Sequence, residues 1–198
     1  MANTNSPFGL RPLGINGAAQ PTFQLGTAKI AAGNATVIAR GSLLIRLNTG
    51  YVTLWTAAQP VSYAVGVFWG AKYLSTALGR TTQNTFWPGN DSASDATAYF
   101  IPFTFPTPMF VIQANAAPIT FASIGLNADI VVGTDTIKGA LGVSGATLNS
   151  TPAVTATLPF RIEGLWSDYA PAGTPGTDNT SNYNLVVVSA NTQQQTGI

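Results

Sequence analysis

Apolar and polar positions alternate with a period of about two along most of this chain, the pattern of strands that bury one face. Runs rich in Thr, Val, Ile and aromatic residues carry this alternation from residue 23 onward. An apolar period near 3.6 residues nowhere persists for more than about two helical turns. The sequence therefore predicts an all-β fold. Periodicity does not separate a β-barrel from a β-sandwich.

The first half of the chain holds a hairpin signal. Residues 42–56, SLLIRLNTGYVTLWT, contain two alternating runs that meet at Asn48-Thr49-Gly50. Residues 64–74 predict the next strand, in which Gly66 and Gly70 indicate a bulge or a close backbone approach. On this reading one face of that strand carries Val65, Val67, Trp69, Ala71 and Tyr73.

The second half of the chain predicts a long loop and then several short strands. Residues 81–99 are polar and read as a surface loop fixed in place by Phe86 and Trp87. Prolines at 102, 106 and 108 interrupt the run that follows, which predicts an edge strand or an approach to a strand at 109–114. Further strands are expected at 127–132, 145–148, 156–165 and 183–190, with a loop between residues 170 and 182.

The N-terminal residues 1–22 predict an extended arm, because their prolines and glycines are spaced too closely for a regular helix. Four apolar residues of the arm follow a loose period of two, so we expect it to lie in a groove of its own or a neighbouring subunit; a disordered tail is the alternative. These residues are Phe8, Leu10, Leu13 and Ile15. Residues 23–190 then form a single β domain, and residues 191–198 form a polar C-terminal tail.

The composition of the chain favours assembly with other protein chains. Only 8% of the 198 residues are charged, against roughly 25% in ordinary globular proteins, while 45% are apolar and the net charge is +1. Net charge and mixed ionic surfaces normally keep monomers apart in solution. A chain with so few charges is poorly protected from association, which favours a protein that binds other protein chains.

The same composition argues against several partners. The eight Lys and Arg residues are scattered singly, so no cluster follows a nucleic-acid backbone. The first ten residues lack the basic and apolar regions of a secretion signal, and no apolar run approaches the roughly 20 residues of a membrane helix. We therefore expect neither nucleic acid nor membrane as a partner.

Catalytic chemistry has little support in the sequence. The chain contains no His and no Cys, which excludes imidazole bases, thiol nucleophiles and the usual zinc sites. A carboxylate pair or an oxygen-ligand calcium site remains, and Asp91-Ser92-Ala93-Ser94-Asp95 offers alternating oxygens. A solvated turn explains this segment better, because the glycine and the terminal Glu of a calcium loop are missing. We expect no enzyme, no cofactor, no metal and no small-molecule substrate.

The tryptophans divide into two predicted roles. Trp55 and Trp69 lie in alternating strand patterns and are expected in the core. Trp87 lies in the predicted loop FWPGN and is expected to be exposed or to anchor an interface. The residues expected to bind a partner are Phe8, Leu10, Arg11, Leu13, Ile15, Phe86 and Trp87.

Several phrases of the sequence together resemble a known family: SPFGLRPLG, GSLLIRLNTGYVTLWTAA, VGVFWGAKY, PMFVIQA, RIEGLW and YNLVVVSAN. They are similar to the small structural proteins encoded beside the major capsid protein in many tailed bacteriophages, which serve as head decoration or cement proteins. The resemblance spans nearly the whole chain and includes no catalytic signature. It implies a β-barrel or β-tulip-like body with extended arms, commonly a trimer at quasi-threefold positions of the capsid.

The expected function is therefore that of a non-enzymatic virion protein, made in the cytoplasm of the host bacterium. It binds the major capsid protein on the outer surface of the capsid and stabilises the shell, as a homotrimer with arm-mediated contacts. Two alternatives stay open. One is another virion component, such as a tail or head-completion protein. The other is a glycan-binding module on a virion fibre, using Trp87, Asp91 and Asp95.

Overall fold

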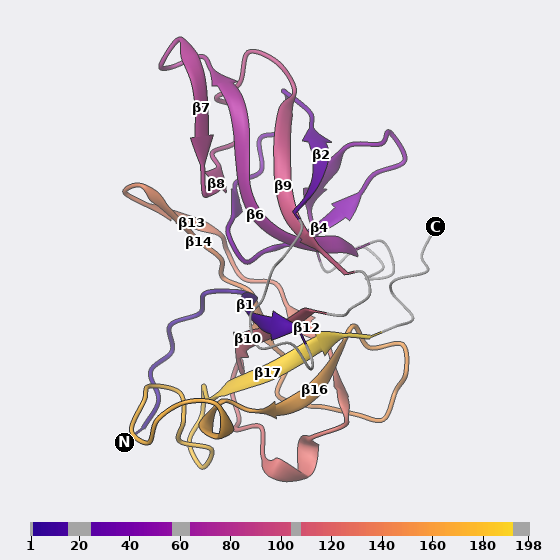
Figure 1. Cartoon of the computed structure of the whole chain (residues 1–198), viewed down its shortest axis with the longest axis vertical. Coiled ribbons are helices and arrows are strands. Elements are labelled where there is room, and N and C mark those ends of the chain that lie inside the picture. Colours follow the sequence, from indigo (N-terminus) through magenta and orange to yellow (C-terminus); the bar gives the residue numbers. More distant parts are fainter. Residues whose placement is uncertain (1, 16–24, 57–63, 104–107, 192–198) are drawn as a thin grey trace.

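The computed structural model describes residues 2–15, 25–56, 64–103 and 108–191. Within these ranges the fold is all-β, which confirms the predicted class. The helical segments described are two short 3-10 turns, η2 (Phe121–Ser123) and η3 (Trp166–Asp168). Figure 1 shows two lobes, one above the other, each built around one antiparallel sheet.

The upper lobe of Figure 1 contains a six-stranded sheet in the order β2-β9-β6-β4-β5, with β7 also paired to β6. Its strands are β2 (Gly26–Ile30), β4 (Leu43–Arg46), β5 (Val52–Leu54), β6 (Ala64–Ser75), β7 (Arg80–Asn84) and β9 (Ala96–Pro102). The two ends of the order, β2 and β5, contact each other. Tyr51 Oη donates to Asp95 Oδ2 across this closure at 2.7 Å. The sheet is therefore curled into a barrel-like shape.

The lower lobe contains a five-stranded sheet in the order β1-β10-β17-β16-β11. Its strands are β1 (Arg11–Ile15), β10 (Pro108–Gln113), β11 (Asn127–Ala128), β16 (Phe160–Leu165) and β17 (Leu185–Ala190). All neighbours are antiparallel. The predicted strands at 156–165 and 183–190 thus exist with shorter bounds, and the one at 109–114 exists one residue earlier, as β10. Only the first two residues of the strand predicted at 127–132 belong to this sheet, as β11.

Three two-stranded ribbons connect or cover the lobes. They are β3 (Ile38–Ala39) with β8 (Phe86–Trp87), β12 (Ile130–Val131) with β15 (Thr147–Leu148), and β13 (Thr136–Lys138) with β14 (Leu141–Val143). The β13–β14 ribbon projects to the left of the molecule in Figure 1. All three residues of β13 and Leu141 of β14 are exposed.

Buried side chains form two cores. The shared core lies between the sheets and takes side chains from both, including Ile45 and Val67 from the upper sheet and Phe110 and Ile162 from the lower one. The barrel core lies inside the curled sheet. It includes Ile30, Leu44, Phe68, Trp87 and Phe100.

Strand β4 shows how one sheet supplies both cores. Leu43 and Ile45 contribute to the shared core, while Leu44 between them contributes to the barrel core. Alternate side chains of a strand point to opposite faces, so both faces of β4 are buried. This explains its continuous apolar run.

Strand β6 confirms the predicted effect of its glycines. A Cβ on Gly66 would lie 2.2 Å from the carbonyl oxygen of Ile101, so β6 and β9 approach too closely for a side chain there. The register with β9 shifts between Phe68 and Gly70, a bulge. The predicted single face was wrong for this reason: Val67 faces the shared core, whereas Tyr73 beyond the bulge faces the barrel core.

The hairpin prediction is confirmed and the loop prediction is corrected. Strands β4 and β5 pair around Gly50, whose φ of +84° is a conformation that glycine adopts readily. Residues 81–99 are not one loop, because β7 and β8 occupy residues 80–87 and β9 begins at Ala96. The polar strand β7 has no fully buried residue, so it lacks the apolar alternation by which a strand is recognised.

Candidate functional site

The N-terminal residues 2–15 lie on the chain's own body. Leu10 is 1% exposed, and its N–H donates to the carbonyl of Gly41 at 2.8 Å. Gln113 accepts a hydrogen bond from the N–H of Ser6 at 3.0 Å and donates to the carbonyl of Thr4 at 2.9 Å. Of the two predicted locations for the arm, residues 2–15 occupy the groove of their own subunit. Residues 16–22 of the arm and 192–198 of the predicted tail lie outside the described residues.

Strand β1 makes this N-terminal segment the edge of the five-stranded sheet. Residues Arg11–Ile15 pair with β10, and the register shifts between Pro12 and Gly14. Proline has no N–H to give to a neighbouring strand, so an edge position suits Pro12. Residues 11–15 therefore belong to the same sheet as strands of the predicted 23–190 domain.

Trp87 is not an exposed anchor, which corrects the sequence prediction. Its side chain is 0% exposed and its ring meets that of Tyr73 edge to face, with centroids 5.3 Å apart. The indole N–H donates to the carbonyl of Asn34 at 3.0 Å, which satisfies its polar atom. Phe86, which was also expected to bind a partner, is buried too. Trp55 is buried, as predicted. Trp87 belongs to the barrel core, and neither it nor Phe86 presents an exposed ring to a partner.

The seam between the lobes, where the β3–β4 turn meets the segments around β13 and β14, is fixed by a half-buried carboxylate. Asp135 accepts hydrogen bonds from the N–H of Ala39 (2.8 Å), the hydroxyl of Ser42 (2.5 Å) and the N–H of Gly145 (3.2 Å). Burial raises the pKa of Asp135, and these hydrogen bonds to its charged form oppose that rise. The residue ties the β3–β4 turn to the segments around β13 and β14.

The chain backbones also cross closely at this seam. Gly9 has a φ of +72°, and a Cβ there would lie 2.5 Å from the carbonyl oxygen of Gly41 and 2.6 Å from Cβ of Ser144. Only glycine leaves room for three segments to meet in this way. The N-terminal segment is thus held against both the β3–β4 turn and the segment after β14.

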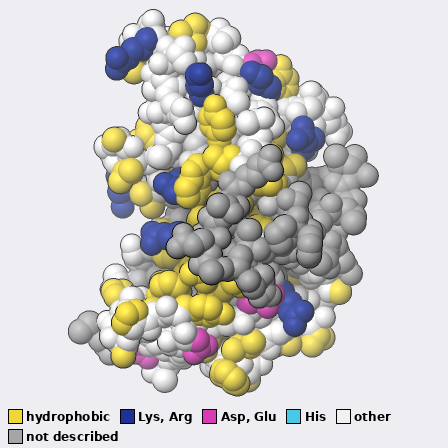
Figure 2. Space-filling model, viewed as in Figure 1, with side chains coloured by type: hydrophobic (Ala, Val, Ile, Leu, Met, Phe, Trp, Pro, Cys, Tyr) yellow, Lys and Arg dark blue, Asp and Glu magenta, His cyan; other side chains and the backbone are white. Residues whose placement is uncertain are grey.

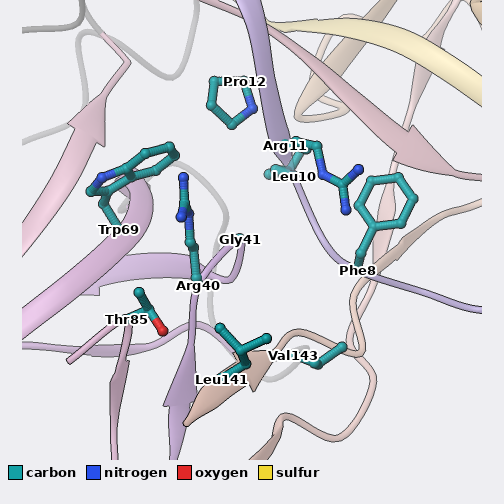
Figure 3. A pocket seen from close by; sticks show the side chains of 11 residues that line it. Phe8, Leu10, Arg11, Pro12, Arg40, Gly41, Trp69, Thr85, Leu141 and Val143 are labelled. Atoms are coloured by element: carbon teal, nitrogen blue, oxygen red, sulfur yellow. The ribbon is translucent and has the colours of Figure 1, made fainter. Parts of the chain in front are cut away.

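A pocket of about 410 Å³ opens beside this seam. Its walls come from the N-terminal segment, the β3–β4 turn, β6, the residue before β8, and β14. Its lining residues are Phe8, Leu10, Arg11, Pro12, Arg40, Gly41, Trp69, Thr85, Leu141, Gly142 and Val143. Figure 3 shows that Arg40 lies beside Trp69 on one side of the pocket, and Arg11 extends toward Phe8 on the other.

Two arginines stacked on aromatic rings dominate the chemistry of this pocket. The guanidinium carbon of Arg40 lies 3.3 Å from the ring centroid of Trp69, and that of Arg11 lies 4.3 Å from the ring centroid of Phe8. Partial burial lowers the pKa of Arg40, and the positive charge of Arg11 lowers it further. The lining residues that the structure describes include no acidic one.

A second hollow of about 490 Å³ adjoins the first, because both are lined by Trp69 and Thr85. Its other lining residues are Leu25, Gly70, Gln83, Asn84 and Tyr99. Among the described residues, the Thr85 hydroxyl is the buried side-chain polar atom without a hydrogen-bond partner. An unpaired buried hydroxyl costs about 1–3 kcal/mol, and this one is closed to solvent, so it offers no hydrogen-bonding group to the hollow.

Part of the first pocket is lined by residues that the sequence predicts to bind a partner. Phe8, Leu10 and Arg11 line the first pocket, whereas Leu13 lies outside its lining and the side chain of Ile15 lies outside the described residues. Arg40 and Trp69 were missed. The signal that could have found them is weak: a lone cation after one strand and an aromatic residue next to Gly70 in another.

The acidic residues do not form a second site. Asp91 accepts hydrogen bonds from Ser75, Thr76 and the N–H of Ala77, while Asp95 binds Tyr51 and the N–H of Ala32. In the part of the chain that the structure describes, no three acidic residues are grouped as metal ligands are. The two carboxylates of the segment 91–95 thus bind different partners within the chain.

No protein-family model, curated protein or solved structure matches this chain. Among the described residues, no helix has the length and apolar character to cross a membrane. On the face shown in Figure 2, Lys and Arg side chains are dispersed among mostly uncharged ones.

Proposed function

We propose that the chain is a non-enzymatic virion structural protein that binds the outer surface of a tailed-phage capsid and stabilises it, as a decoration or cement protein. The observation that carries the proposal is the pocket at the seam, which joins two arginines, two aromatic rings and an exposed leucine. Arginine and aromatic residues are enriched where protein interfaces gain most of their affinity. The described residues that line this pocket include no carboxylate pair.

The projecting ribbon supports a protein partner. Leu141 is 61% exposed and Ile137 is 39% exposed, and both lie on the β13–β14 ribbon beside the pocket. Exposed apolar residues grouped next to a pocket indicate a surface that a partner covers. The low charge of the chain suits such burial, because few ions need to be stripped of water.

The N-terminal segment takes a different part in this proposal from the one first expected. Its residues 2–15 build one wall of the pocket and pair with β10, so they present the capsid-binding surface instead of crossing to another subunit. Deleting the segment would remove an edge strand and the buried Leu10, so loss of binding after deletion would not isolate a binding role. Point substitutions in the pocket rim are the better test.

The test is binding to undecorated heads of the phage that encodes the chain, measured by co-sedimentation. We expect wild-type protein to bind and Leu141→Asp to lose most of its binding, because a charge would be buried against the capsid. Phe121→Asp is the matched control, since Phe121 is 76% exposed on η2 of the lower lobe and lies outside both hollows. Equal binding by both variants would contradict the role of the ribbon, and no binding by wild type would contradict the function.

The oligomeric state is a separate part of the proposal. The trimer rests on the resemblance to decoration proteins and on the scarcity of charged residues. Mass photometry or light scattering of the purified chain is expected to give a mass three times that of the 20.5 kDa chain. A monomer at high concentration would contradict the trimer, and a head-bound monomer would leave the capsid role in place. A tail or head-completion role would show itself as binding to those parts and not to the capsid surface.

One observation favours glycan binding as a second candidate function. The hollow beside Trp69 and Tyr99 also carries the amides of Gln83 and Asn84, and sugars bind through aromatic stacking and neutral hydrogen bonds. This differs from the expected glycan site, because Trp87 is buried. A glycan array in which wild type binds and Tyr99→Ala does not would establish it. An array without hits would dismiss it.

A further inference from the structure

We propose that the pocket at the seam binds carboxylate side chains of an acidic, partly apolar segment of a partner protein. The inference rests on the proposed function, since it names the chemistry by which the capsid would be recognised. It follows from the juxtaposition of Arg11 and Arg40, stacked on Phe8 and Trp69, in one open pocket.

The charge of the pocket is uncompensated by its own walls. Arg11 lies close enough to Arg40 for its charge to lower the pKa of Arg40, and no Asp or Glu lines the pocket. The repulsion between two neighbouring positive charges is offset when an anion binds close to both. Hydrogen bonds between guanidinium groups and carboxylates are charge-assisted and are frequently bidentate. An anionic group is thus the ligand that this pocket stabilises best.

Stacking orients both guanidinium groups for this task. Each lies over an aromatic ring, at 3.3 Å for Arg40 on Trp69 and 4.3 Å for Arg11 on Phe8. A planar guanidinium stacked on a ring keeps the N–H groups at its edge available for an acceptor. The rings also limit the rotamers of these long side chains, so less entropy is lost when a carboxylate binds.

The apolar walls select a protein segment over a small anion. Pro12 and Val143 line the pocket beside the charges, and Leu141 stands exposed at its edge. A free phosphate or sulfate would leave these side chains in contact with water. A segment in which apolar residues flank an acidic one covers them and gains their burial as well.

Nucleic acid fits this surface less well than protein does. The other six cationic residues line neither hollow: Lys29, Arg46, Lys72, Arg80, Lys138 and Arg161. A nucleic acid binds through a series of phosphate contacts along a basic track. Two arginines in a recess with apolar walls match one or two carboxylates instead.

The second hollow gives the bound segment a direction. It continues from the first across Trp69 and Thr85 and carries the neutral amides of Gln83 and Asn84. Amide side chains can pair with the main chain of an extended segment. The acidic residue therefore lies between Arg11 and Arg40, and the neighbouring main chain runs toward Asn84.

The experiment is a calorimetric titration of the full chain with a blocked hexapeptide of alternating leucine and glutamate, and with its glutamine counterpart. We expect the glutamate peptide to bind about tenfold more tightly, and the difference to shrink as salt is added. Arg40→Gln and Arg11→Gln are each expected to weaken the glutamate peptide by about tenfold. Arg80→Gln is the matched control, because it removes the same charge from an exposed residue of β7 outside both hollows.

Three outcomes would overturn the inference. The first is equal affinity for the two peptides, the second is unchanged binding by Arg40→Gln, and the third is tighter binding of inorganic phosphate or of oligothymidylate than of the glutamate peptide. Circular dichroism of each variant confirms that the fold is retained. Head binding measured in parallel separates the two proposals: heads bound without peptide selectivity overturn the pocket chemistry alone, while peptide selectivity without head binding overturns the capsid role alone.

Discussion

The two cores of the molecule differ in where their residues come from along the chain. The barrel core is assembled from residues between Ala28 and Phe100, all within the upper lobe. The shared core takes residues from Leu10 to Ala190 and lies between both sheets. One core therefore stabilises a single lobe, and the other holds the two lobes together.

The cores also differ in chemistry. The shared core contains phenylalanine rings without polar atoms, with Phe103 edge to face against Phe110 and Phe160 at centroid distances of 6.0 and 5.9 Å. The barrel core pairs Tyr73 with Trp87, and both carry polar ends that are hydrogen-bonded to neighbouring segments. The difference teaches that the barrel core fixes loop positions as well as excluding water, whereas edge-to-face packing of apolar rings predominates in the shared core.

The largest effect is expected from the shared core. Phe160→Ala removes a fully buried ring and should lower the free energy of unfolding by about 3–5 kcal/mol. Because this core joins the sheets, amide hydrogen exchange should quicken in both β9 and β17. Faster exchange in β17 alone would show that the lobes are stabilised independently.

A smaller loss is expected at the seam. Asp135→Ala leaves the N–H groups of Ala39 and Gly145 without their acceptor and should cost about 3 kcal/mol in urea denaturation. Asp135→Asn keeps one acceptor oxygen and should cost about half as much. If the two variants were equally stable, the hydrogen bonds of this carboxylate would not be what ties the segments together.

Within the barrel core, Trp87→Phe tests the hydrogen bond between the indole N–H of Trp87 and the carbonyl of Asn34. It removes the donor to the carbonyl of Asn34 and part of a buried ring, with an expected cost of about 2 kcal/mol. Hydrogen exchange should quicken in β6 and β9 and stay unchanged in β16 and β17. Loss of protection in the lower sheet would contradict a core confined to one lobe.

Acid should weaken the barrel lobe. Hydrogen bonds from Ser75, Ala77 and Thr76 lower the pKa of Asp91 from its ordinary value of 3.8. A carboxyl with a lowered folded-state pKa contributes stability that is present above the unfolded value and is lost as the pH falls through the folded one. We therefore expect Tm to fall below pH 4 in wild type and to fall less steeply in Asp91→Asn. Parallel curves for the two proteins would remove Asp91 from this dependence.

Asp135 should respond to pH in the opposite sense. Its folded-state pKa is raised, so ionisation of this carboxyl is less favourable in the folded chain than in the unfolded one. The free energy of unfolding therefore gains from its protonation as the pH falls through the raised value. Comparison of wild type with Asp135→Asn across pH 3–7 checks the sign. A larger advantage of wild type over Asp135→Asn at pH 7 than at pH 4 would contradict the prediction.

Much of the strand content could be predicted from the sequence, because alternation and turn residues act over a few positions. The hairpin at Gly50 and the bulge near Gly70 are of this kind. Trp87 could not be placed in the same way: Pro88 and Gly89 mark a turn locally, but its burial depends on pairing with Ile38, about 50 positions earlier. Short-range signals carry no information about such a partner.

The candidate site shows the same limit more strongly. The N-terminal residues Phe8 and Arg11 were expected to bind a partner, because an apolar alternation is visible in that segment. Their companions Arg40 and Trp69 lie in separate elements, and only the folded chain brings them together. A lone arginine in a sequence does not show whether an acid or an aromatic ring will lie beside it.

The position of β1 at the edge of the five-stranded sheet bears on synthesis. All strands of the six-stranded sheet lie before residue 103 of 198, so the barrel lobe can fold while the ribosome is still translating the rest. Strand β1 is made long before its partner β10, which begins at Pro108. The nascent chain therefore keeps this strand unpaired until β10 has been made, and the pocket beside it is complete only after Val143, the lining residue that lies furthest along the chain, has been added.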